Sequence, residues 1–470
     1  MLGRKARDQL ELFVAGSLDQ LVPEDHVLAR VDRVLDLGWL RAEVADCYCG
    51  DNSRPGIDPE VAVRLMLAGL LLGIVHDRRL MREAQVNIAI RWFIGYGLHE
   101  RLPDHSSLTR IRQRWGEARF RRIFQRTVTA CLDAGIATAE VVHIDASLIR
   151  ANASWESLVE RHAGDVMAAN PGDREMAAGG TRHRGRGRSG KVSRTDPDAS
   201  MATAAENRRL EPSYKQHTAV DDTRGVVLDV AVTTGAASER EVIEAQVDEV
   251  RAIAGHEIET VTADAGYAYA RVYGGLERRG IDPVIPVRKD PSRSRVPLRR
   301  FRYDARNDNL KCPRGKVLRF LRVTGRGRFF SSRTSDCARC PLRGDCLPST
   351  RINKEVVIPH DYPALLRARR RHARWSEDDR RLYRRHLWRS EGFHGEAKTW
   401  HGLGRAIRRG LDNMKVQAYL TAAAINLKRL ATAIFAGLAA IWTSRAVEKA
   451  PPCVHQAHTR RTDFRTIAAA

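Results

Sequence analysis

The spacing of apolar residues up to about residue 135 predicts helices. Apolar positions recur there every three or four residues, as on one face of an α-helix. Asp58 and Pro59 suit the N-cap and the first position of a helix, and the apolar run 61–75 follows them. After the turn at 103–107, a long segment combines an apolar face with many arginines. We therefore expect an all-helical domain in this part of the chain.

The pattern changes near residue 138, where strand-like and helix-like segments begin to alternate. Runs rich in Val and Ile predict strands at 140–149, 257–263 and 283–287. Between and after them, 238–254 and 268–279 have helical patterns. Such alternation is typical of α/β domains.

Two segments interrupt the α/β pattern. Residues 155–212 lose apolar periodicity and are rich in Gly, Arg and Ser, which predicts a mobile basic loop. Residues 300–350 contain four of the eight cysteines. The expected organisation is a helical domain (1–135), an α/β domain (136–299 and 351–442), the basic loop (155–212), a cysteine-bearing insertion (300–350) and a loose C-terminal tail (443–470).

The charge balance indicates a polyanionic partner. Eighty Lys and Arg residues against 57 Asp and Glu give a formal charge of +23, and such an excess repels itself unless a polyanion offsets it. Nucleic acid fits better than an anionic membrane, because the basic residues are mostly arginines within folded-looking segments and no helix has convincing bulky apolar anchors for lipid. The absence of a recognisable secretory signal predicts a cytoplasmic, nucleoid-associated protein.

Two aspartates stand out within the α/β pattern. Asp145 lies inside an apolar strand, where a charge costs several kcal/mol unless it is paired or binds a metal. Asp264 ends the next strand, and Gly266 after it permits a sharp exit. Ligands of α/β domains collect at such strand ends. Each aspartate alone is more often structural, but the pair predicts a shared site.

A helical stretch near residue 391 offers a third acid. At 100° per residue, Arg384, Glu391, His394 and Lys398 share one face. A solvent-exposed charged helix is the alternative interpretation. Glu396 is the rival acid, but it lies about 140° round the helix from Glu391, so both cannot face one site.

Three convergent carboxylates suit cleavage of a phosphodiester. Two Mg²⁺ or Mn²⁺ ions can activate a water or hydroxyl and stabilise the leaving oxygen. Mg²⁺ prefers oxygen ligands and keeps several waters, so few carboxylates suffice.

Several sequence motifs together resemble bacterial insertion-sequence transposases of the DDE class. The segments LDQLVPEDHVLARVDRVLDL, IDPEVAVRLMLAGLLLGIV and LPDHSSLTRIRQRW are similar to the helical N-terminal domain of that family. HIDASLIRANAS, TADAGY and SEGFHGEAKTWHGLGRAIRRGL resemble its three acid motifs. The resemblance implies a ribonuclease H-like catalytic core with an insertion between the last two acids, preceded by an all-helical domain.

The resemblance also assigns roles. Asp145, Asp264 and Glu391 become the catalytic, metal-binding triad for two Mg²⁺ or Mn²⁺ ions, and Lys398 becomes a contact to the transposon end. The family's arginine four residues before the Glu is replaced here by Leu387, and Arg384 is the better geometric substitute. The full expected DNA-binding set is Lys398, Arg384, His394, Arg405, Arg408, Arg110, Arg112 and Arg114.

Four clustered cysteines suggest a structural metal. Cys312, Cys337, Cys340 and Cys346 supply the four thiolates of a tetrahedral Zn²⁺ site, with one CxxC pair among them. Reduced free thiols and a disulfide are the alternatives.

The predicted function is DNA transposition. The protein would bind terminal inverted repeats as a homodimer, cleave the element ends and join them to target double-stranded DNA through a two-metal DDE site. The alternatives are a DNA-binding regulator with an inactive catalytic domain, and a nuclease of the same fold that cuts without joining.

Overall fold

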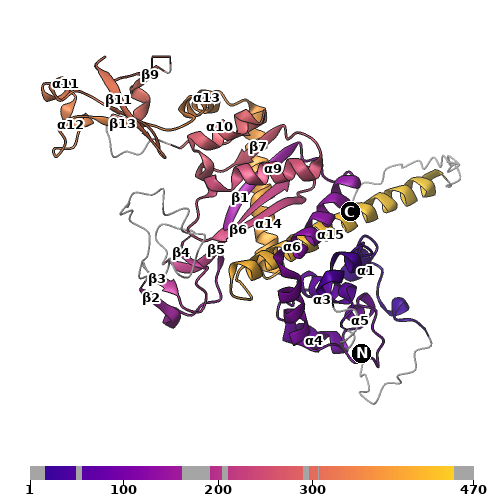
Figure 1. Ribbon diagram of the computed structural model, residues 1–470. Coiled ribbons are helices and arrows are strands. Elements are labelled where there is room, and N and C mark those ends of the chain that lie inside the picture. The colour runs from indigo at the N-terminus through magenta and orange to yellow at the C-terminus, as the bar shows by residue number, and fades with distance from the viewer. Residues whose placement is uncertain are drawn as a thin grey trace, which may run out of the picture.

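The computed structural model describes residues 16–48, 56–160, 191–203, 210–288, 296–304, 306–307 and 309–448. These residues form a helical region, a mixed sheet flanked by helices, and a smaller sheet that projects from the far end of the molecule (Figure 1).

Helices alone build the described N-terminal region. Asp58 accepts a hydrogen bond from the backbone N–H of Glu60, and Pro59 begins α3, so the predicted start of this helix is confirmed. The region comprises η1 (Leu18–Leu21), α1 (Val27–Asp32), α2 (Leu40–Glu43), η2 (Ala45–Cys47), α3 (Pro59–Leu71), α4 (Asp77–Val86), α5 (Ile88–Phe93) and α6 (His105–Asp133).

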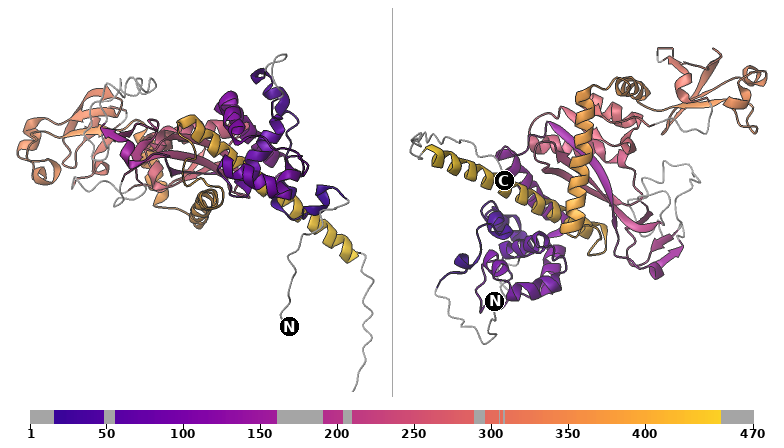
Figure 2. Two further views of the ribbon diagram at one scale, coloured as in Figure 1. Left: turned by 90° about the horizontal axis from the view of Figure 1, so that it is seen from below. Right: turned by 180° about the vertical axis from the view of Figure 1, so that it is seen from behind.

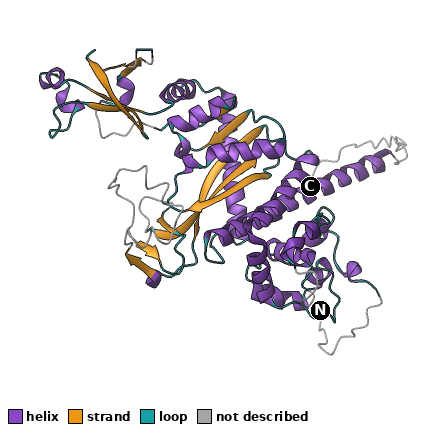
Figure 3. Cartoon of the chain, viewed as in Figure 1, coloured by secondary structure: helices purple, strands orange, loops and turns teal. Residues whose placement is uncertain are grey.

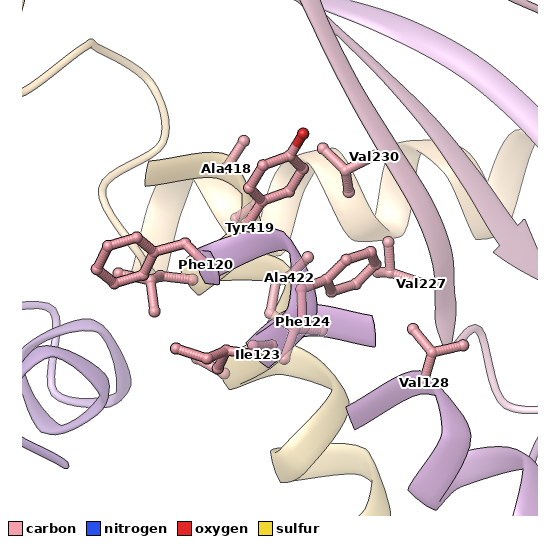
Figure 4. Close-up of a cluster of buried hydrophobic side chains, with 14 of the residues drawn as sticks. Phe120, Ile123, Phe124, Val128, Val227, Val230, Ala418, Tyr419 and Ala422 are labelled. Atoms are coloured by element: carbon pink, nitrogen blue, oxygen red, sulfur yellow. The ribbon is translucent and has the colours of Figure 1, made fainter. Parts of the chain in front are cut away.

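Helix α6 is bent, and its second half joins the helical region to the sheet. Gly116 has φ 70° and ψ 171°, a left-handed φ that glycine tolerates. Beyond this bend, α6 packs against α15 (Leu411–Glu448) and β6 (Val227–Thr234) (Figure 4). The rings of Phe124 and Tyr419 stack there with 6.2 Å between their centroids. The predicted basic helix is therefore partly a core element.

The central sheet has the strand order β6-β5-β1-β7-β8, with β4 pairing with β5 beyond the end of β6. β5 runs antiparallel to both of its neighbours, β6 and β1, whereas β1, β7 and β8 are parallel. This is the ribonuclease H-like arrangement, and the predicted fold class is confirmed. The strands are β1 (Val141–Arg150), β4 (Ser200–Ala202), β5 (Glu211–Asp221), β6, β7 (Thr260–Ala263) and β8 (Asp282–Val284).

Helices cover both faces of this sheet. α9 (Ile243–Ala254) and α10 (Ala270–Arg278) lie on one face, and α14 (Glu377–Trp400) crosses the other (Figures 1 and 2). α14 contacts β1, β5, β7 and β8. It starts with a capping box between Ser376 and Asp379, which satisfies backbone donors at the helix start. The colouring by secondary structure in Figure 3 shows the resulting helix–sheet–helix layering.

The side of α14 that faces the sheet is a stripe of buried residues at helical spacing. Its members are His386, Ser390, Phe393, His394 and Ala397. Because this stripe includes polar side chains, the helix is bound to the sheet by hydrogen bonds as well as by apolar contact.

The cysteine-bearing insertion has a core of its own. Its antiparallel strands have the order β13-β12-β11-β10-β9, and buried Leu310, Leu318 and Phe330 lie at its centre. β13 completes this sheet beyond residue 350, so the insertion extends past the expected boundary. Its elements are η6 (Leu298–Arg300), β9 (Arg302–Asp304), β10 (Asn309–Lys311), β11 (Val317–Thr324), β12 (Gly327–Ser331), α11 (Thr334–Ala338), α12 (Arg343–Cys346) and β13 (Glu355–Ile358), and α13 (Tyr362–His372) follows.

Two other segments differ from the sequence prediction. The expected basic loop carries regular structure at its edges, namely η3 (Trp155–Ser157), β2 (Leu158–Glu160), β3 (Lys191–Ser193) and β4; residues 161–190 and 204–209 lie outside the described residues. Helix α15 continues through residue 448 rather than ending near 442, and 449–470 are likewise outside. Within the described part of the chain, no helix has the length and apolar character needed to cross a bilayer.

Candidate active site

The sheet places the two predicted aspartates side by side. β1 and β7 are parallel neighbours with Ile144 opposite Ala263, so Asp145 and Asp264 are the next residues on adjacent strands. Neighbouring strands lie about 4.8 Å apart. Asp264 follows the last residue of β7, and its side chain accepts a hydrogen bond of 2.7 Å from the backbone N–H of Gly266. The turn thereby holds this carboxylate at the tip of the strand.

Helix α14 brings cationic and polar side chains to Asp145. The Lys398 Nζ donates to Ser147 Oγ over 2.5 Å, and the carboxylate of Asp145 opposes the lowering of the Lys398 pKa by burial. His394 Nε2 lies 3.7 Å from Asp145 Oδ2 and 3.3 Å from Thr218 Oγ1. Burial lowers the pKa of His394 to about 3. His394 is therefore a buried neutral residue beside the acid, and a contact between it and DNA stays a prediction.

Glu391 and its rival Glu396 have different surroundings. Glu391 is exposed, yet its charge raises the pKa of Asp145, so it acts on the aspartate site. Glu396 is bound by Lys428 Nζ at 2.6 Å and by Arg429 at 3.3 Å. Burial opposes ionisation of Glu396, but His401 and these two cations lower its pKa to about 2. Glu396 fastens α14 to α15, which leaves Glu391 as the acid of this helix near the site.

Burial and neighbouring acids dominate the electrostatics of Asp145, although Lys398 and the Ala146 N–H lie beside it. Burial raises its pKa to about 7, and the charges of Asp264, Glu239 and Glu391 add to this effect. The pKa of Asp264 is also raised, by burial and by Glu239, although the Gly266 N–H and Arg288 oppose the shift. Mutually repelling carboxylates at one place fit a site that a dication would neutralise.

The sequence analysis missed Glu239 in η4 (Glu239–Glu241). Its position just after β6 and before α9 offers no signal, because acids are common at the start of helices for electrostatic reasons. Only the packing of η4 against η5 (Ala265–Tyr267) brings it to Asp264.

The residues present fit a divalent cation in their donor chemistry. A Cβ built on Gly266 would meet Asp264 Oδ1 and Glu239 Oε2, each at 2.6 Å, so both carboxylates line the space above this glycine. As they stand, no three His, Cys, Asp or Glu side chains of the described ranges are arranged to hold a metal ion. Asp145, Asp264 and Glu391 would therefore have to adjust their rotamers to hold Mg²⁺ or Mn²⁺ together.

Two of the arginines predicted to contact DNA form ion pairs with one aspartate of the fold. Arg112 is buried and makes two hydrogen bonds to the Asp77 carboxylate, at 2.8 and 2.9 Å. Arg408 binds the same carboxylate at 2.5 Å. The guanidinium of Arg112 is occupied inside the fold, and Arg408 shares that ion pair, so a contact of either residue with DNA would require the pair to open and stays a prediction.

The other predicted cations remain at the surface. Arg384 pairs with Glu377 at 2.7 Å. The guanidinium of Arg114 lies over the Tyr48 ring, 5.1 Å from its centroid. Arg110 and Arg405 are exposed.

The four cysteines of the insertion surround one cavity. Cys312, Cys337, Cys340 and Cys346 all line a space of about 40 Å³, and all four are free thiols. Burial raises the pKa of Cys346, Lys354 opposes this, and the other three sulfurs add to it. The structure thus brings together the residues that the spacing singled out, without a disulfide among them.

The described residues thus form a ribonuclease H-like sheet with one aspartate within β1 and another at the tip of β7, preceded by a helical region. Two family models match parts of the chain. The transposase domain DUF772 matches residues 16–114, and a transposase DDE domain matches residues 311–431. These matches confirm the predicted resemblance to DDE transposases. The second match includes Glu391 and begins after both aspartates.

Solved structures of the Mos1 transposase are also similar. The Mos1 mariner paired end complex with Mn is 11% identical, with 54% of this chain and 65% of that chain covered and a TM-score of 0.16. The complex with the left transposon end is 10% identical, with 52% and 65% covered and a TM-score of 0.17. This chain thus spans about two thirds of their length, and likeness at this level supports no inference about its chemistry. Among curated proteins, none matches.

Proposed function

We propose that this protein is an active DNA transposase that cleaves the ends of its element and transfers them to target DNA. One observation carries the proposal: Asp145, Asp264 and Glu391 come from β1, the tip of β7 and α14, yet the charges of the other two act on Asp145. Together with the transposase domains, this convergence supports a metal-dependent DDE site.

Each residue has a distinct task in this proposal. Asp145 in β1 and Asp264 at the tip of β7 would hold the cations, and Glu391, which is exposed, would supply the third carboxylate where DNA can approach. When bound, two Mg²⁺ or Mn²⁺ ions lower the pKa of the attacking water or hydroxyl and stabilise the leaving oxygen. Lys398 orients Ser147 beside Asp145 and places a positive charge next to the scissile phosphate.

Binding of the element ends would use the exposed arginines. Arg110, Arg114, Arg384 and Arg405 supply phosphate contacts, which give salt-dependent affinity, while base contacts set the register. Because two ends must be joined to one target, a homodimer on double-stranded DNA is the simplest assembly, and a nucleoid-associated, cytoplasmic location follows from this substrate.

The direct test is metal-dependent cleavage of DNA that carries the inverted repeats flanking the gene. Wild type should cut and join with Mn²⁺, and Asp145→Asn should lose at least about a thousandfold in rate while retaining DNA affinity. A wild type that binds the repeats but never cuts them would identify an inactive regulator. Cutting without a joined product would identify a nuclease.

Two variants of α14 test whether Glu391 or Glu396 is the third catalytic acid. Glu391→Gln should abolish cleavage with little change in the free energy of unfolding, because Glu391 is exposed. Glu396→Gln should leave cleavage by the folded protein intact but lower its stability. The reverse pattern would transfer the catalytic role to Glu396.

We also propose that the insertion binds one structural Zn²⁺ through Cys312, Cys337, Cys340 and Cys346. Their common cavity and free thiols support this ligand set. Purified protein should contain one zinc per chain by elemental analysis, and Cys340→Ser should lose it. Cys47→Ser, which changes a thiol in the helical region, is the control. Stoichiometric zinc in Cys340→Ser would refute the site.

A further inference from the structure

Glu239 is held in a fixed position by Lys215. The Lys215 Nζ donates to Glu239 Oε1 over 3.1 Å and to the backbone carbonyl of Ala237 over 2.9 Å. Only 14% of the Lys215 side chain is exposed, so this anchor is largely shielded from solvent. One carboxylate oxygen of Glu239 is thus occupied, and the other, Oε2, is directed elsewhere.

The second oxygen is directed at the proposed site. Glu239 Oε2 and Asp264 Oδ1 both lie 2.6 Å from the point that a Cβ on Gly266 would occupy. The two oxygens are therefore separated by no more than about twice that distance, although no hydrogen bond joins them among the described residues. The carboxylates of Glu239 and Asp264 thus face the same small space next to Gly266, as two ligands of one cation would.

An independent observation comes from Tyr267. Its side chain is 1% exposed, and its hydroxyl has no hydrogen-bond partner within the described residues. Burial raises the pKa of Tyr267, and the charges of Asp145, Glu239 and Asp264 add to this. A buried hydroxyl without a partner costs about 1–3 kcal/mol, so its position among three acids indicates a missing polar neighbour, such as a water on a bound cation.

We propose that Glu239 is a fourth carboxylate of the active site, which binds a divalent cation together with Asp264 while Lys215 holds it in place. This inference rests on the proposed transposase function. The Tyr267 hydroxyl would donate a hydrogen bond to a water of the same cation. Glu239 approaches from η4 and reaches the carboxylate of Asp264 at the tip of β7.

The test is Mn²⁺ binding to the full, metal-free protein, measured by electron paramagnetic resonance of free Mn²⁺. Glu239→Gln keeps the size of the side chain and an oxygen that can accept from Lys215. We expect it to weaken Mn²⁺ affinity about tenfold or more, without lowering the melting temperature. Glu239→Asp, which keeps the charge on a shorter arm, should fall between wild type and Glu239→Gln. Glu241→Gln changes an exposed acid of the same 3-10 helix and should bind as wild type does.

Two results would overturn the proposal. One is Mn²⁺ affinity in Glu239→Gln equal to that of Glu241→Gln, and the other is loss of a cooperative melting transition, which would assign Glu239 to folding. Asp145→Asn distinguishes a failure of the role of Glu239 from a failure of the proposed function. If it loses Mn²⁺ binding and cleavage while Glu239→Gln keeps both, only the role of Glu239 fails. If Asp145→Asn keeps both, the proposed function itself fails.

Discussion

Two largely buried aspartates, Asp77 and Asp145, stand in opposite electrostatic surroundings. Asp77 lies between the helical region and the segment after α14, where burial would raise its pKa but Arg112 and Arg408 hold it below the ordinary value. Asp145 lies in the sheet, where burial raises its pKa to about 7 and three other acids add to the effect. The ion pairs of Asp77 stabilise the fold. At Asp145, by contrast, the carboxylates repel one another, and a bound cation would reduce this repulsion. The charges of the neighbours, rather than burial itself, therefore distinguish the ion-paired Asp77 from Asp145, for which we propose a catalytic role.

The largest expected effect is on stability at Asp77. Asp77→Asn leaves the Arg112 and Arg408 cations without their counter-charge, and removal of one partner of a buried ion pair costs about 3–5 kcal/mol. Asp145→Asn removes repulsion, so its free energy of unfolding should equal or exceed that of wild type. Urea unfolding of the metal-free proteins measures both. Equal destabilisation by the two substitutions would contradict the proposed difference between the electrostatic surroundings of Asp77 and Asp145.

A smaller loss is expected at Glu396. Glu396→Gln deprives Lys428 and Arg429 of a charge, and we expect a loss of about 2 kcal/mol near neutral pH. Since the pKa of Glu396 is lowered to about 2, its contribution is present above the unfolded-state pKa and disappears as the pH falls through about 2. Wild type and Glu396→Gln should therefore converge in stability at the acid end of a denaturation series. A constant difference at every pH would show that the lost contact is not electrostatic.

In the metal-free protein, ionisation of Asp145 should change the stability less than ionisation of Glu396 does, and in the opposite direction. Its folded-state pKa is raised to about 7, so the stability that it contributes is complete below the unfolded-state pKa and is lost as the pH rises through 7. Between pH 5 and 8 we expect the melting temperature to fall by a few degrees, roughly 2 °C for each kcal/mol. Mn²⁺ should reverse the fall, and Asp145→Asn should remove it. Scanning calorimetry with and without Mn²⁺ gives both comparisons.

The smallest effect concerns single phosphate contacts. Arg110→Gln should weaken DNA binding about equally for all sequences and reduce the slope of log affinity against log salt by about 1. Arg112→Gln should leave that slope unchanged and lower the stability, because Arg112 is occupied by Asp77. Titrations at several salt concentrations distinguish the two. A reduced slope for Arg112→Gln would mean that its ion pair opens on DNA.

The order of elements could be predicted because each is encoded locally. The Asp58–Pro59 helix start and the Val- and Ile-rich run around Asp145 depend on neighbouring residues only, and both occur as expected. The family motifs likewise led to Asp145, Asp264 and Glu391. Partners distant in sequence could not be predicted. Arg112 resembles any exposed arginine of an amphipathic helix until α4 places Asp77 against it, and Glu239 resembles a helix-start acid until η4 packs beside Asp264.

The position of α15 has a consequence for synthesis of the protein. This helix, the last within the described residues, packs against α1, α3, α6 and β6. Its Lys428 and Arg429 form ion pairs with Glu396. Until the ribosome has translated residues 411–448, the apolar surfaces of those earlier elements that α15 would bury remain exposed to solvent. A premature stop codon upstream of α15 therefore yields a chain with exposed core surface, which is a target for chaperones and proteases.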